Sequence, residues 1–517
     1  MVLVLNLLVL TCVNGAYGIL LPPILENMLH IEKKHLDNVW KATLTAMVRL
    51  VVYLFYPLAG WLADTYFSRH KTIVSSMWIV CFATLTTTVL ISLRYAFPDH
   101  GYASNVHTYI YPLLFVLMTV GLAGFHANVV PFGTDQLQDA PGYELVVFVH
   151  WYVWTFSLSS LPFPRCAGLH HTVHALILSC AHSVCITLAL SIYFLFQHCL
   201  LKEPASGNPF TTIFNVLNYA RKHQYARLRS AFTYSDGERP SRIDFAKVRY
   251  GGPFLTEQVE DVKTFYRMLS VLATLLVIFT AAAASTSTMG LLSSHMSYKP
   301  DNQSFLFCLL ESWLDNLPFC FPVLSIPLFH FFVNPFTRNC QATSLKGIGF
   351  GTLLFTASIL CALTLDTVGH ACQPGDVPCL FSLNSTSGHN ILLDYRLVLL
   401  PGILGGLAWP FVAIGVYKFI CAQSPHQTKG TFIGIYYCML GVGFALGFLL
   451  MLPFYLQSSI NWPVSCGFWY YLINAMIMLA GFFIFSVVAK HYKQRKRDDP
   501  SFEQANIEAY YEAKVSL

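Results

Sequence analysis

Long, nearly uninterrupted apolar runs recur along the whole chain, and they constrain its fold more than any other feature. A helix that crosses a bilayer needs about 20 mostly apolar residues, because lipid cannot satisfy backbone polar groups. The runs lie near residues 2–28, 42–63, 72–93, 109–132, 143–162 and 172–198, and near 264–292, 308–335, 345–366, 394–420, 430–453 and 465–489. The sequence therefore predicts an all-α polytopic membrane protein with about 12 transmembrane helices.

The charge composition supports the bilayer as the solvent of this chain. The chain is 55% hydrophobic and only 11% charged, whereas soluble domains carry about 25% charged residues. The net charge of +5 comes from short clusters beside the apolar runs, so nucleic-acid binding is not expected. The 15 cysteines show no CxxC spacing, and no nucleophile–base pair or phosphate-cradling loop is apparent. We therefore expect no metal site, no cofactor and no enzymatic activity.

The runs form two groups of six, which predicts two bundles. The polar stretch between the groups is too long for an ordinary connection between two helices. We predict an N-terminal six-helix bundle at 1–198, a cytoplasmic linker at 199–263, a C-terminal six-helix bundle at 264–490 and a cytoplasmic tail at 491–517. No internal repeat is apparent, so the two-fold arrangement rests on the number of spans alone.

Lysine and arginine in short loops predict the orientation of the chain. Basic clusters follow the second run at Arg69 and Lys71, occur in the linker at Arg221 and Lys222, and open the tail at Lys490. An even number of spans puts all of them on one side, the cytoplasm. The first run begins without a basic leader, so we expect a first span rather than a cleavable signal peptide. A plasma membrane location is the default expectation, with an endolysosomal membrane as the alternative.

Two glycosylation sequons fall in loops assigned to the opposite side of the membrane. They begin at Asn302 and Asn384, and their position agrees with the predicted orientation of a glycoprotein. Cys372 and Cys379 share the second of these loops, where a disulfide is plausible.

The loop after the second run combines an acidic residue with a basic cluster. Asp64 closes one predicted helix and Arg69 opens the next, which suits a cytoplasmic gate that opens and closes. Gly60 would allow two helices to approach closely. The alternative is that Arg69 and its basic neighbours only set the membrane topology.

The end of the fourth run is unusually polar for a membrane helix. His126, Asn128 and Pro131 interrupt it among several glycines, and broken helices at mid-membrane are where transporters place their binding sites. His126 titrates near neutral pH when unperturbed and could carry a proton. The alternative is a neutral histidine bonded to a neighbouring helix.

These motifs together resemble the proton-coupled oligopeptide transporter (POT/PTR) family of the major facilitator superfamily, in particular its animal branch, solute carrier family 15. The similar stretches are Gly60–Ile73, Asn128–Gln136, His150–Trp154, Tyr250–Lys263, Ile326–Phe329 and Gln423–Pro425. The resemblance implies a secondary-active transporter that moves di- and tripeptides, or free histidine, together with protons by alternating access. Its partners would be a small solute, protons and the lipid bilayer.

The resemblance also implies which residues line the solute site. Tyr53 coincides with a family tyrosine at the peptide site, and Tyr436 stands where the family usually has a tryptophan. With Trp154 of the fifth run, His126 and Asn128, these residues form the predicted lining. His126 replaces a family lysine and is the predicted proton-coupling residue.

Several family charges are absent from this chain. The acidic and basic positions of the first span are occupied by Asn6, Val9 and Leu10, and a proton-linked histidine aligns with Ala46. The tenth-span glutamate associated with the peptide amino group aligns with Trp409. A zwitterionic peptide needs opposite charges at both ends, because desolvated charges are costly unless paired. These departures leave open a second hypothesis, an uncoupled or non-transporting relative that senses a solute or binds a partner.

Overall fold

A computed structural model provides the architecture of the chain. It describes residues 1–28, 38–97, 102–137, 142–161, 171–205, 207–223, 240–295, 317–333, 344–371, 397, 399–456 and 466–493. The predicted glycosylation sites Asn302 and Asn384, the predicted disulfide between Cys372 and Cys379, and the tail beyond residue 493 lie outside these ranges.

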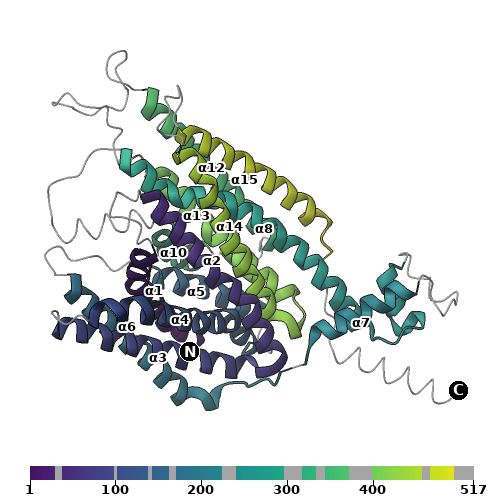
Figure 1. Ribbon diagram of the computed structural model, residues 1–517. Coiled ribbons are helices and arrows are strands. Elements are labelled where there is room, and N and C mark those ends of the chain that lie inside the picture. Colours follow the sequence, from purple (N-terminus) through teal and green to yellow (C-terminus); the bar gives the residue numbers. More distant parts are fainter. Residues whose placement is uncertain are drawn as a thin grey trace.

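Within the described ranges, each predicted apolar run contains a helix, which confirms the all-α polytopic fold. The first half contains α1 (Val2–Met28), α2 (Asn38–Leu62) continued by the π-helical segment η1 (Ala63–Phe67), α3 (Arg69–Ala96), α4 (Tyr102–Asp135), α5 (Gly142–Ser159) and α6 (His171–Phe196). The second half contains α8 (Thr256–His295), α10 (Leu317–Leu328) continued by η6 (Phe329–Val333), α12 (Ser344–Ala371), α13 (Leu399–Gln423), α14 (Lys429–Leu456) and α15 (Cys466–His491). Figure 1 shows the two sets of helices.

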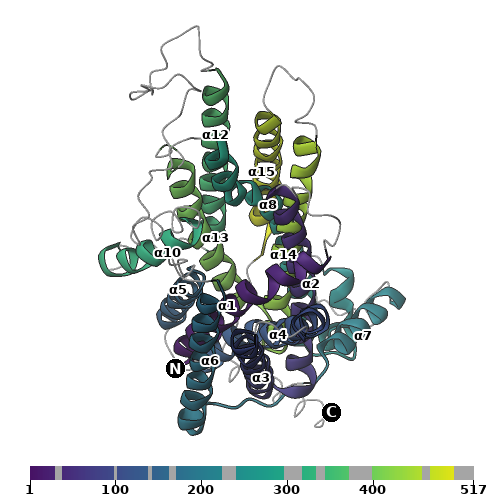
Figure 2. The ribbon, with the colours of Figure 1, turned by 60° about the vertical axis from the view of Figure 1, so that its left-hand side comes forward.

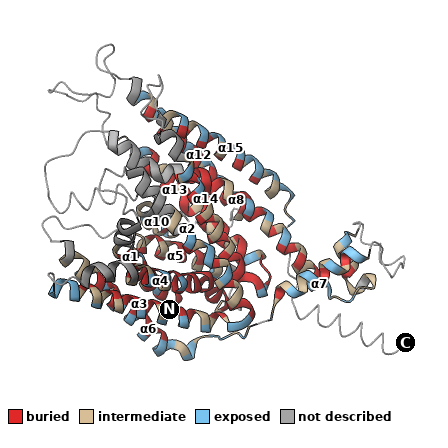
Figure 3. Cartoon of the chain, in the orientation of Figure 1, coloured by how far each residue is buried: buried red, intermediate tan, exposed pale blue. Residues whose placement is uncertain are grey.

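Hydropathy and length distinguish the helices that can cross a membrane. Within the described ranges, nine helices are long and apolar enough to do so, and α1 and α10 contain shorter apolar segments. The spanning window of α4 is 78% buried, whereas those of α6 and α15 are 28% buried. Figure 3 shows the same contrast between α4 and the outer helices. The peripheral helices therefore present apolar side chains outward, as lipid requires.

The contacts between the halves have a two-fold pattern that no sequence repeat reveals. The second helix of the first half, α2, packs along α14, which is the fifth helix of the second half. Reciprocally α5, the fifth helix of the first half, packs against α10, the second helix of the other half. Figures 1 and 2 both show α2 beside α14. Equivalent helices thus form both sides of the interface, as expected for two related bundles.

The connection between the halves contains short helical segments of its own. After η2 (Gln197–Cys199) come α7 (Pro209–Lys222), η4 (Arg242–Ala246) and η5 (Val248–Tyr250). A small core of Val216, Ala246, Val259 and Val262 joins α7 and η4 to the start of α8. The helix α8 begins at Thr256, before the predicted apolar run at 264. Its first two turns are polar, so the hydropathy of the sequence gives no signal for them. Figures 1 and 2 show α7 projecting to one side of the bundles.

Candidate transport gate and central site

The predicted gate residues Asp64 and Arg69 form a buried ion pair. Asp64 lies in η1, where the wider π-helical turn ends the second span. Ser68 has a φ of 65° and reverses the chain into α3, of which Arg69 is the first residue. Arg69 Nε donates to Asp64 Oδ1 at 3.1 Å, and both side chains are buried. The short reversal therefore brings together two charges that lie only five residues apart.

Both members of this pair also reach the second half of the molecule. The backbone N–H and the Oγ1 hydroxyl of Thr431, in α14, donate to Asp64 Oδ2 at 2.8 and 3.0 Å. Arg69 donates from its second terminal nitrogen to the backbone carbonyl of His426 at 2.5 Å. His426 opens η8 (His426–Thr428), just before α14. The pair thus ties the end of α2 to the start of α14, across the interface between the halves.

Asp135 and Lys429 extend this network of ion pairs, and the sequence assigned no role to either. Asp135 ends α4 and accepts from Arg69 at 2.5 Å through Oδ2. Lys429 begins α14 and donates to Asp135 Oδ1 at 3.4 Å. The only sequence signal for Asp135 was its place in the Asn128–Gln136 stretch, and Lys429 gave none. Buried charges of opposite sign alternate here, which offsets part of the cost of removing them from water.

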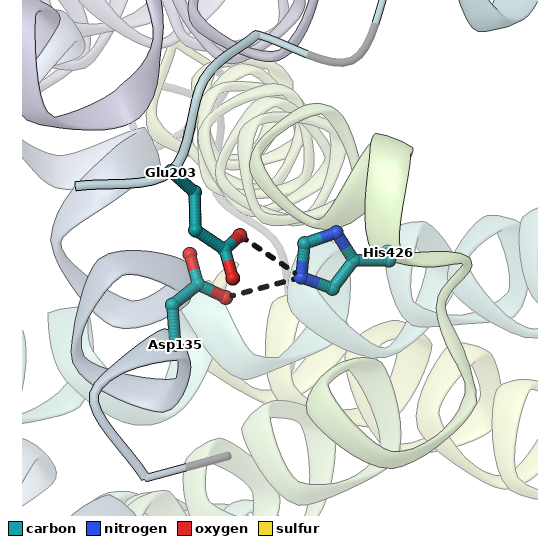
Figure 4. A group of neighbouring side chains, drawn as sticks. All are labelled: Asp135, Glu203 and His426. Carbon is teal, nitrogen blue, oxygen red and sulfur yellow. Dashed lines mark ion pairs between the residues drawn. The ribbon is translucent and has the colours of Figure 1, made fainter. Parts of the chain in front are cut away.

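His426 is a titratable side chain at the solvent-exposed edge of this cluster. His426 Nε2 lies 3.1 Å from Glu203 Oε2 and 3.7 Å from Asp135 Oδ1. Glu203 belongs to the segment that follows α6 and η2, so the three side chains come from three parts of the chain. Figure 4 shows the two carboxylates converging on the imidazole ring. The three ligand-type atoms lie within 4.8 Å of one another.

Glycines allow α2 and α14 to approach closely beside the gate. A Cβ atom on Gly60 would lie 2.2 Å from the backbone oxygen of Gly430, and one on Gly434 would lie 2.4 Å from the backbone oxygen of Tyr56. Asn128 lies at the same level, because a Cβ atom on Gly430 would be 2.9 Å from Asn128 Oδ1 and 3.0 Å from Asp64 Oδ1. The predicted lining residue Asn128 is therefore adjacent to the gate.

A layer of tyrosines around His126 fills the centre of the molecule. Tyr56 Oη lies 3.3 Å from His126 Nδ1, and the His126 ring stacks on Tyr437 with a centroid distance of 5.0 Å. Tyr437 Oη lies 3.2 Å from Tyr152 Oη and 2.7 Å from Tyr417 Oη. Tyr437 and Tyr417 belong to the second half and the others to the first. All five side chains are buried, so the halves are in contact at mid-membrane as well as at the gate.

The predicted lining residues occupy different parts of this arrangement. Tyr53 stacks on Tyr56 at 5.6 Å, and Tyr436 contacts the rings of Tyr417 and Tyr437 at 5.3 Å. Trp154 instead donates from its indole nitrogen to the carbonyl of Val323 at 3.0 Å, between α5 and α10. Residues two apart on a helix face different directions, so the side chains of Trp154 and Tyr152 point away from each other. Tyr53, His126 and Tyr436 thus belong to one cluster, while Trp154 belongs to another contact between the halves.

The substituted family positions are accommodated by packing and by neutral hydrogen bonds. Asn6 donates to Thr155 Oγ1 at 2.8 Å, and Val9, Leu10 and Trp409 are buried in the apolar core. Among the described residues His126 Nε2 has no hydrogen-bond partner.

The fold and this site define a class of protein. Two six-helix sets meet at a shared face that carries buried charges at one end and a polar aromatic layer at mid-membrane. The contacts at the charged end are ion pairs, hydrogen bonds and the close approach of the α2 and α14 backbones. This is the architecture of a membrane transporter of the major facilitator fold, in which two halves rock about a central site.

Comparison with known proteins identifies the family. The family model described as "POT family" matches residues 70–455, and the chain belongs to that family. It is 22% identical over 503 residues to solute carrier family 15 member 3 of Rattus norvegicus, covering 88% of this chain and 85% of the relative. It is also 22% identical over 428 residues to solute carrier family 15 member 5 of Homo sapiens, covering 78% and 69% of the two chains. The chain is a multi-pass membrane transporter and not an enzyme.

Solved structures share the same fold. A structure described as an auto inhibited POT family peptide transporter aligns over 96% of this chain and 98% of that chain, with a TM-score of 0.61 and 15% identity. The POT family transporter PepTSo aligns over 95% and 97%, with a TM-score of 0.60 and 16% identity.

Proposed function

We propose that this protein is a secondary-active, proton-coupled transporter of di- or tripeptides, or of an amino acid such as histidine, that works by alternating access. The observation that carries this proposal is the gate itself, in which buried charges from both halves close one end of the shared face. A rigid scaffold would gain little from such an arrangement, since apolar side chains could replace a buried ion network without loss of stability. Membership of a transporter family supports the same function.

We propose that the solute binds between the halves, at the level of the tyrosine layer. Tyr53, Tyr436 and His126 would contact the solute. Trp154 and Asn128 would lie at the two ends of the route that the solute takes between the halves. In the closed arrangement Tyr437 stacks on His126, so a solute has to displace this ring. Hydroxyl groups and a ring nitrogen can bond amide or carboxylate groups of a small peptide. The boundaries of the bundles at 198, 263 and 490 belong to the same proposal.

His126 remains the proposed proton-coupling residue within the membrane. The ring of His126 contacts the rings of Tyr56, Phe125, Phe156 and Tyr437. None of these can compensate a full positive charge, so we expect protonation of His126 only when a solute carboxylate enters the site. Binding of proton and solute would then be mutually dependent, as symport requires.

The gate is proposed to face the cytoplasm, because the basic clusters lie at that end. We propose the plasma membrane as the site of action, with an endolysosomal membrane as the alternative. Selective labelling of surface protein in intact cells distinguishes the two, since an endolysosomal transporter would be labelled only after permeabilisation.

Uptake into proteoliposomes tests the proposed function. Labelled dipeptides and free histidine are supplied with and without an inward proton gradient. Accumulation above the external concentration that collapses with the gradient supports the symporter. Equilibration that ignores the gradient identifies an uncoupled carrier. No uptake of any tested solute by folded protein contradicts the proposal and favours a sensing or partner-binding relative.

A further inference from the structure

We propose that Lys418, His150 and His330 form a binding site for a small oxyanion, a carboxylate or phosphate group, where α5, α10 and α13 meet. This site goes beyond the proposed transport function and does not include the gate. The proposal rests on three basic side chains that lie together at the interface between the halves, and on a lysine that has no counterion there.

The three side chains belong to helices that pack on one another. α5 is part of the first half, while α10, with its continuation η6, and α13 are part of the second half. Each of the three helices contacts the other two, and Figures 1 and 2 both show them together. His150 lies on α5, His330 on η6 and Lys418 on α13. A ligand held by all three would therefore join the two halves.

Ring contacts bring two neighbouring residues of α5 to two neighbouring residues of η6. The centroid of the His150 ring lies 5.9 Å from that of Phe329, and the centroid of the Trp151 ring lies 5.6 Å from that of His330. His150 also interacts electrostatically with both Lys418 and His330. The three basic groups thus share one neighbourhood, with aromatic rings beside them.

The polar atoms of this cluster lack partners within the described part of the protein. His150 is 7% exposed, and its Nδ1 atom is buried without a hydrogen-bond partner among the described residues. The Nδ1 atom of His330 is buried without a partner in the same ranges. Lys418 is partly buried, and it makes neither an ion pair nor a hydrogen bond with any described residue. Unsatisfied buried polar groups cost free energy, so a ligand that bonds to them is favoured.

The charges at this contact select an anion. At the gate both buried cations pair with carboxylates, as Lys429 does with Asp135. No described carboxylate pairs with Lys418, so the contact of α5 with α10 and α13 contains a cation without a counterion. An oxyanion supplies the missing charge, and its several oxygens can accept from the ammonium group and from imidazole N–H groups together. A metal cation would instead be repelled by the ammonium group.

The surroundings of the site allow two sources of the oxyanion. Trp151 contacts the rings of Trp154 and Phe331, with centroid distances of 5.4 and 6.3 Å. Phe331 is 65% exposed, so the outer side of η6 is accessible to lipid. The headgroup of an anionic lipid can reach the site from that side, and a dissolved anion can reach it between the halves. Both sources present the same chemistry, and the experiment distinguishes them.

The test measures the thermal stability of the full chain in phosphatidylcholine nanodiscs, which does not depend on transport. Sodium phosphate and sodium acetate are each compared with sodium chloride at equal ionic strength and pH, and discs that contain phosphatidylglycerol supply the lipid headgroup. A ligand that binds only the folded protein raises its melting temperature. We expect at least one of these three anions to raise the melting temperature of the wild type by about 1–3 °C relative to chloride.

Three variants and two controls assign this rise to the site. Lys418→Gln should abolish the rise, and His150→Gln and His330→Gln should each reduce it. Lys346→Gln, at an exposed lysine of α12, and His198→Gln, at an exposed histidine of η2, should keep the full rise. Without added anion, Lys418→Gln should melt at or above the wild-type temperature, because it removes an unpaired and partly buried charge. Each variant is compared with itself, with and without anion, so a change in its basal stability does not obscure the result.

The pattern of responses decides the proposal. A rise with phosphate or acetate supports a dissolved anion as the ligand, and a rise with phosphatidylglycerol alone supports a lipid headgroup. An equal rise in Lys418→Gln overturns the proposal, and so does the absence of a rise with all three anions, in which case the lysine only reaches interfacial water. Failure of the uptake assay together with a normal anion response would contradict only the proposed transport function.

Discussion

Asp64 is contacted by both halves of the molecule. It accepts from Arg69 in its own half and from the backbone and side chain of Thr431 in the other half. A carboxylate held by several donors in a buried place is stable only while those donors stay, since an unpaired buried charge is costly. Opening the gate must therefore remove Asp64 from Thr431 and admit water to it at the same time.

Replacing Asp64 by Asn should weaken the closed gate. Removing one partner of a buried ion pair typically costs about 3–5 kcal/mol, because the other charge stays buried. We expect a lower melting temperature in detergent and uptake reduced by at least about 10-fold. Glu257→Gln, at an exposed acidic residue of α8, is the control. Unchanged flux through Asp64→Asn protein in the membrane would remove Asp64 from the gate.

In the tyrosine layer, Tyr437 is contacted by both halves, as Asp64 is at the gate. Its ring stacks on His126, and its hydroxyl joins Tyr152 of the first half to Tyr417 of the second. The Tyr437→Phe substitution keeps the stacking and removes both hydroxyl contacts.

We expect Tyr437→Phe to destabilise the closed arrangement by about 1–3 kcal/mol, the cost of leaving buried hydroxyl partners unsatisfied. A melting curve measures this, with Tyr66→Phe as the matched control at an exposed tyrosine. Equal melting temperatures for Tyr437→Phe and wild type would show that the hydroxyl bridge contributes nothing.

At the scale of elements, the contact between α2 and α14 decides how the halves meet. Gly60 and Gly434 each face backbone atoms of the opposite helix at distances that admit no side chain. Close backbone approach allows the gate residues at the ends of both helices to reach one another. Small residues at such crossings are the usual device of membrane helices.

Substitution of Gly60 by Ala should force the two helices apart. Its Cβ atom would meet the backbone of Gly430 at 2.2 Å, and backbone cannot move away as a flexible side chain can. We expect about 1–3 kcal/mol of destabilisation, measured as a lower melting temperature, together with a longer distance between spin labels at the gate. Gly347→Ala is the control, because its Cβ atom would lie 3.8 Å from the backbone oxygen of Phe411, an ordinary van der Waals distance. Identical behaviour of the two variants would contradict the role of this crossing.

The connection between the halves is held to α8 by a compact charge cluster. Asp244 pairs with Lys247 and Lys263, and Lys247 also pairs with Glu260 at 2.6 Å. Burial alone would raise the pKa of Asp244, but hydrogen bonds from Lys247, Lys263 and Ser241 outweigh it and hold this pKa well below its ordinary value. Burial alone would lower the pKa of Lys247, but its bonds to Asp244 and Glu260 raise it above the ordinary value.

These shifts predict that the cluster is insensitive to pH near neutrality. Because the pKa of Asp244 is lowered, the stabilisation that its ion pairs contribute is complete above about pH 3.9. This stabilisation is lost as the pH falls through the folded-state pKa. Because the pKa of Lys247 is raised, the stabilisation that its ion pairs contribute is complete below about pH 10.4. This stabilisation is lost as the pH rises through the folded-state pKa. We expect limited proteolysis of residues 240–255 to proceed equally, relative to an unfolded substrate, between about pH 5 and about pH 9. Asp244→Asn should accelerate cleavage several-fold, and Glu257→Gln should not. A marked pH dependence of the wild type would contradict this role of the cluster.

At the scale of the whole molecule, the two halves are held together by side chains rather than by the chain connecting them. The contacts of α2 with α14 and of α5 with α10 and α13 join the bundles along their length. We therefore expect residues 1–223 and 240–517, expressed as two chains, to assemble and copurify. The Gly60→Ala variant of the first fragment should reduce recovery of the second. Separate purification of the two fragments would contradict the view that contacts between the bundles hold the halves together.

Much of the fold could be predicted from the sequence because hydropathy is a local property. Each apolar run had to become a helix, since lipid offers no partner for backbone N–H and C=O groups. The first turns of α8 lie before the predicted run at 264, and a polar helical turn gives no such signal. The ion pair of Asp64 with Arg69 was predictable because the two residues lie close together along the chain.

Only the tertiary structure could assign the remaining members of the site. Arg69 and the carbonyl of His426 are separated by 357 positions, and Asp64 and Thr431 by 367. Lys429 and His426 look like ordinary loop residues until α14 packs along α2. The same holds for Tyr437, one of 27 tyrosines in the chain, whose role depends on stacking against His126. The sequence alone determined which segments enter the membrane, because that depends on the chemistry of each segment. The packing of the two halves decided which charges and rings meet, because those partners lie far apart in the chain and no periodicity records them.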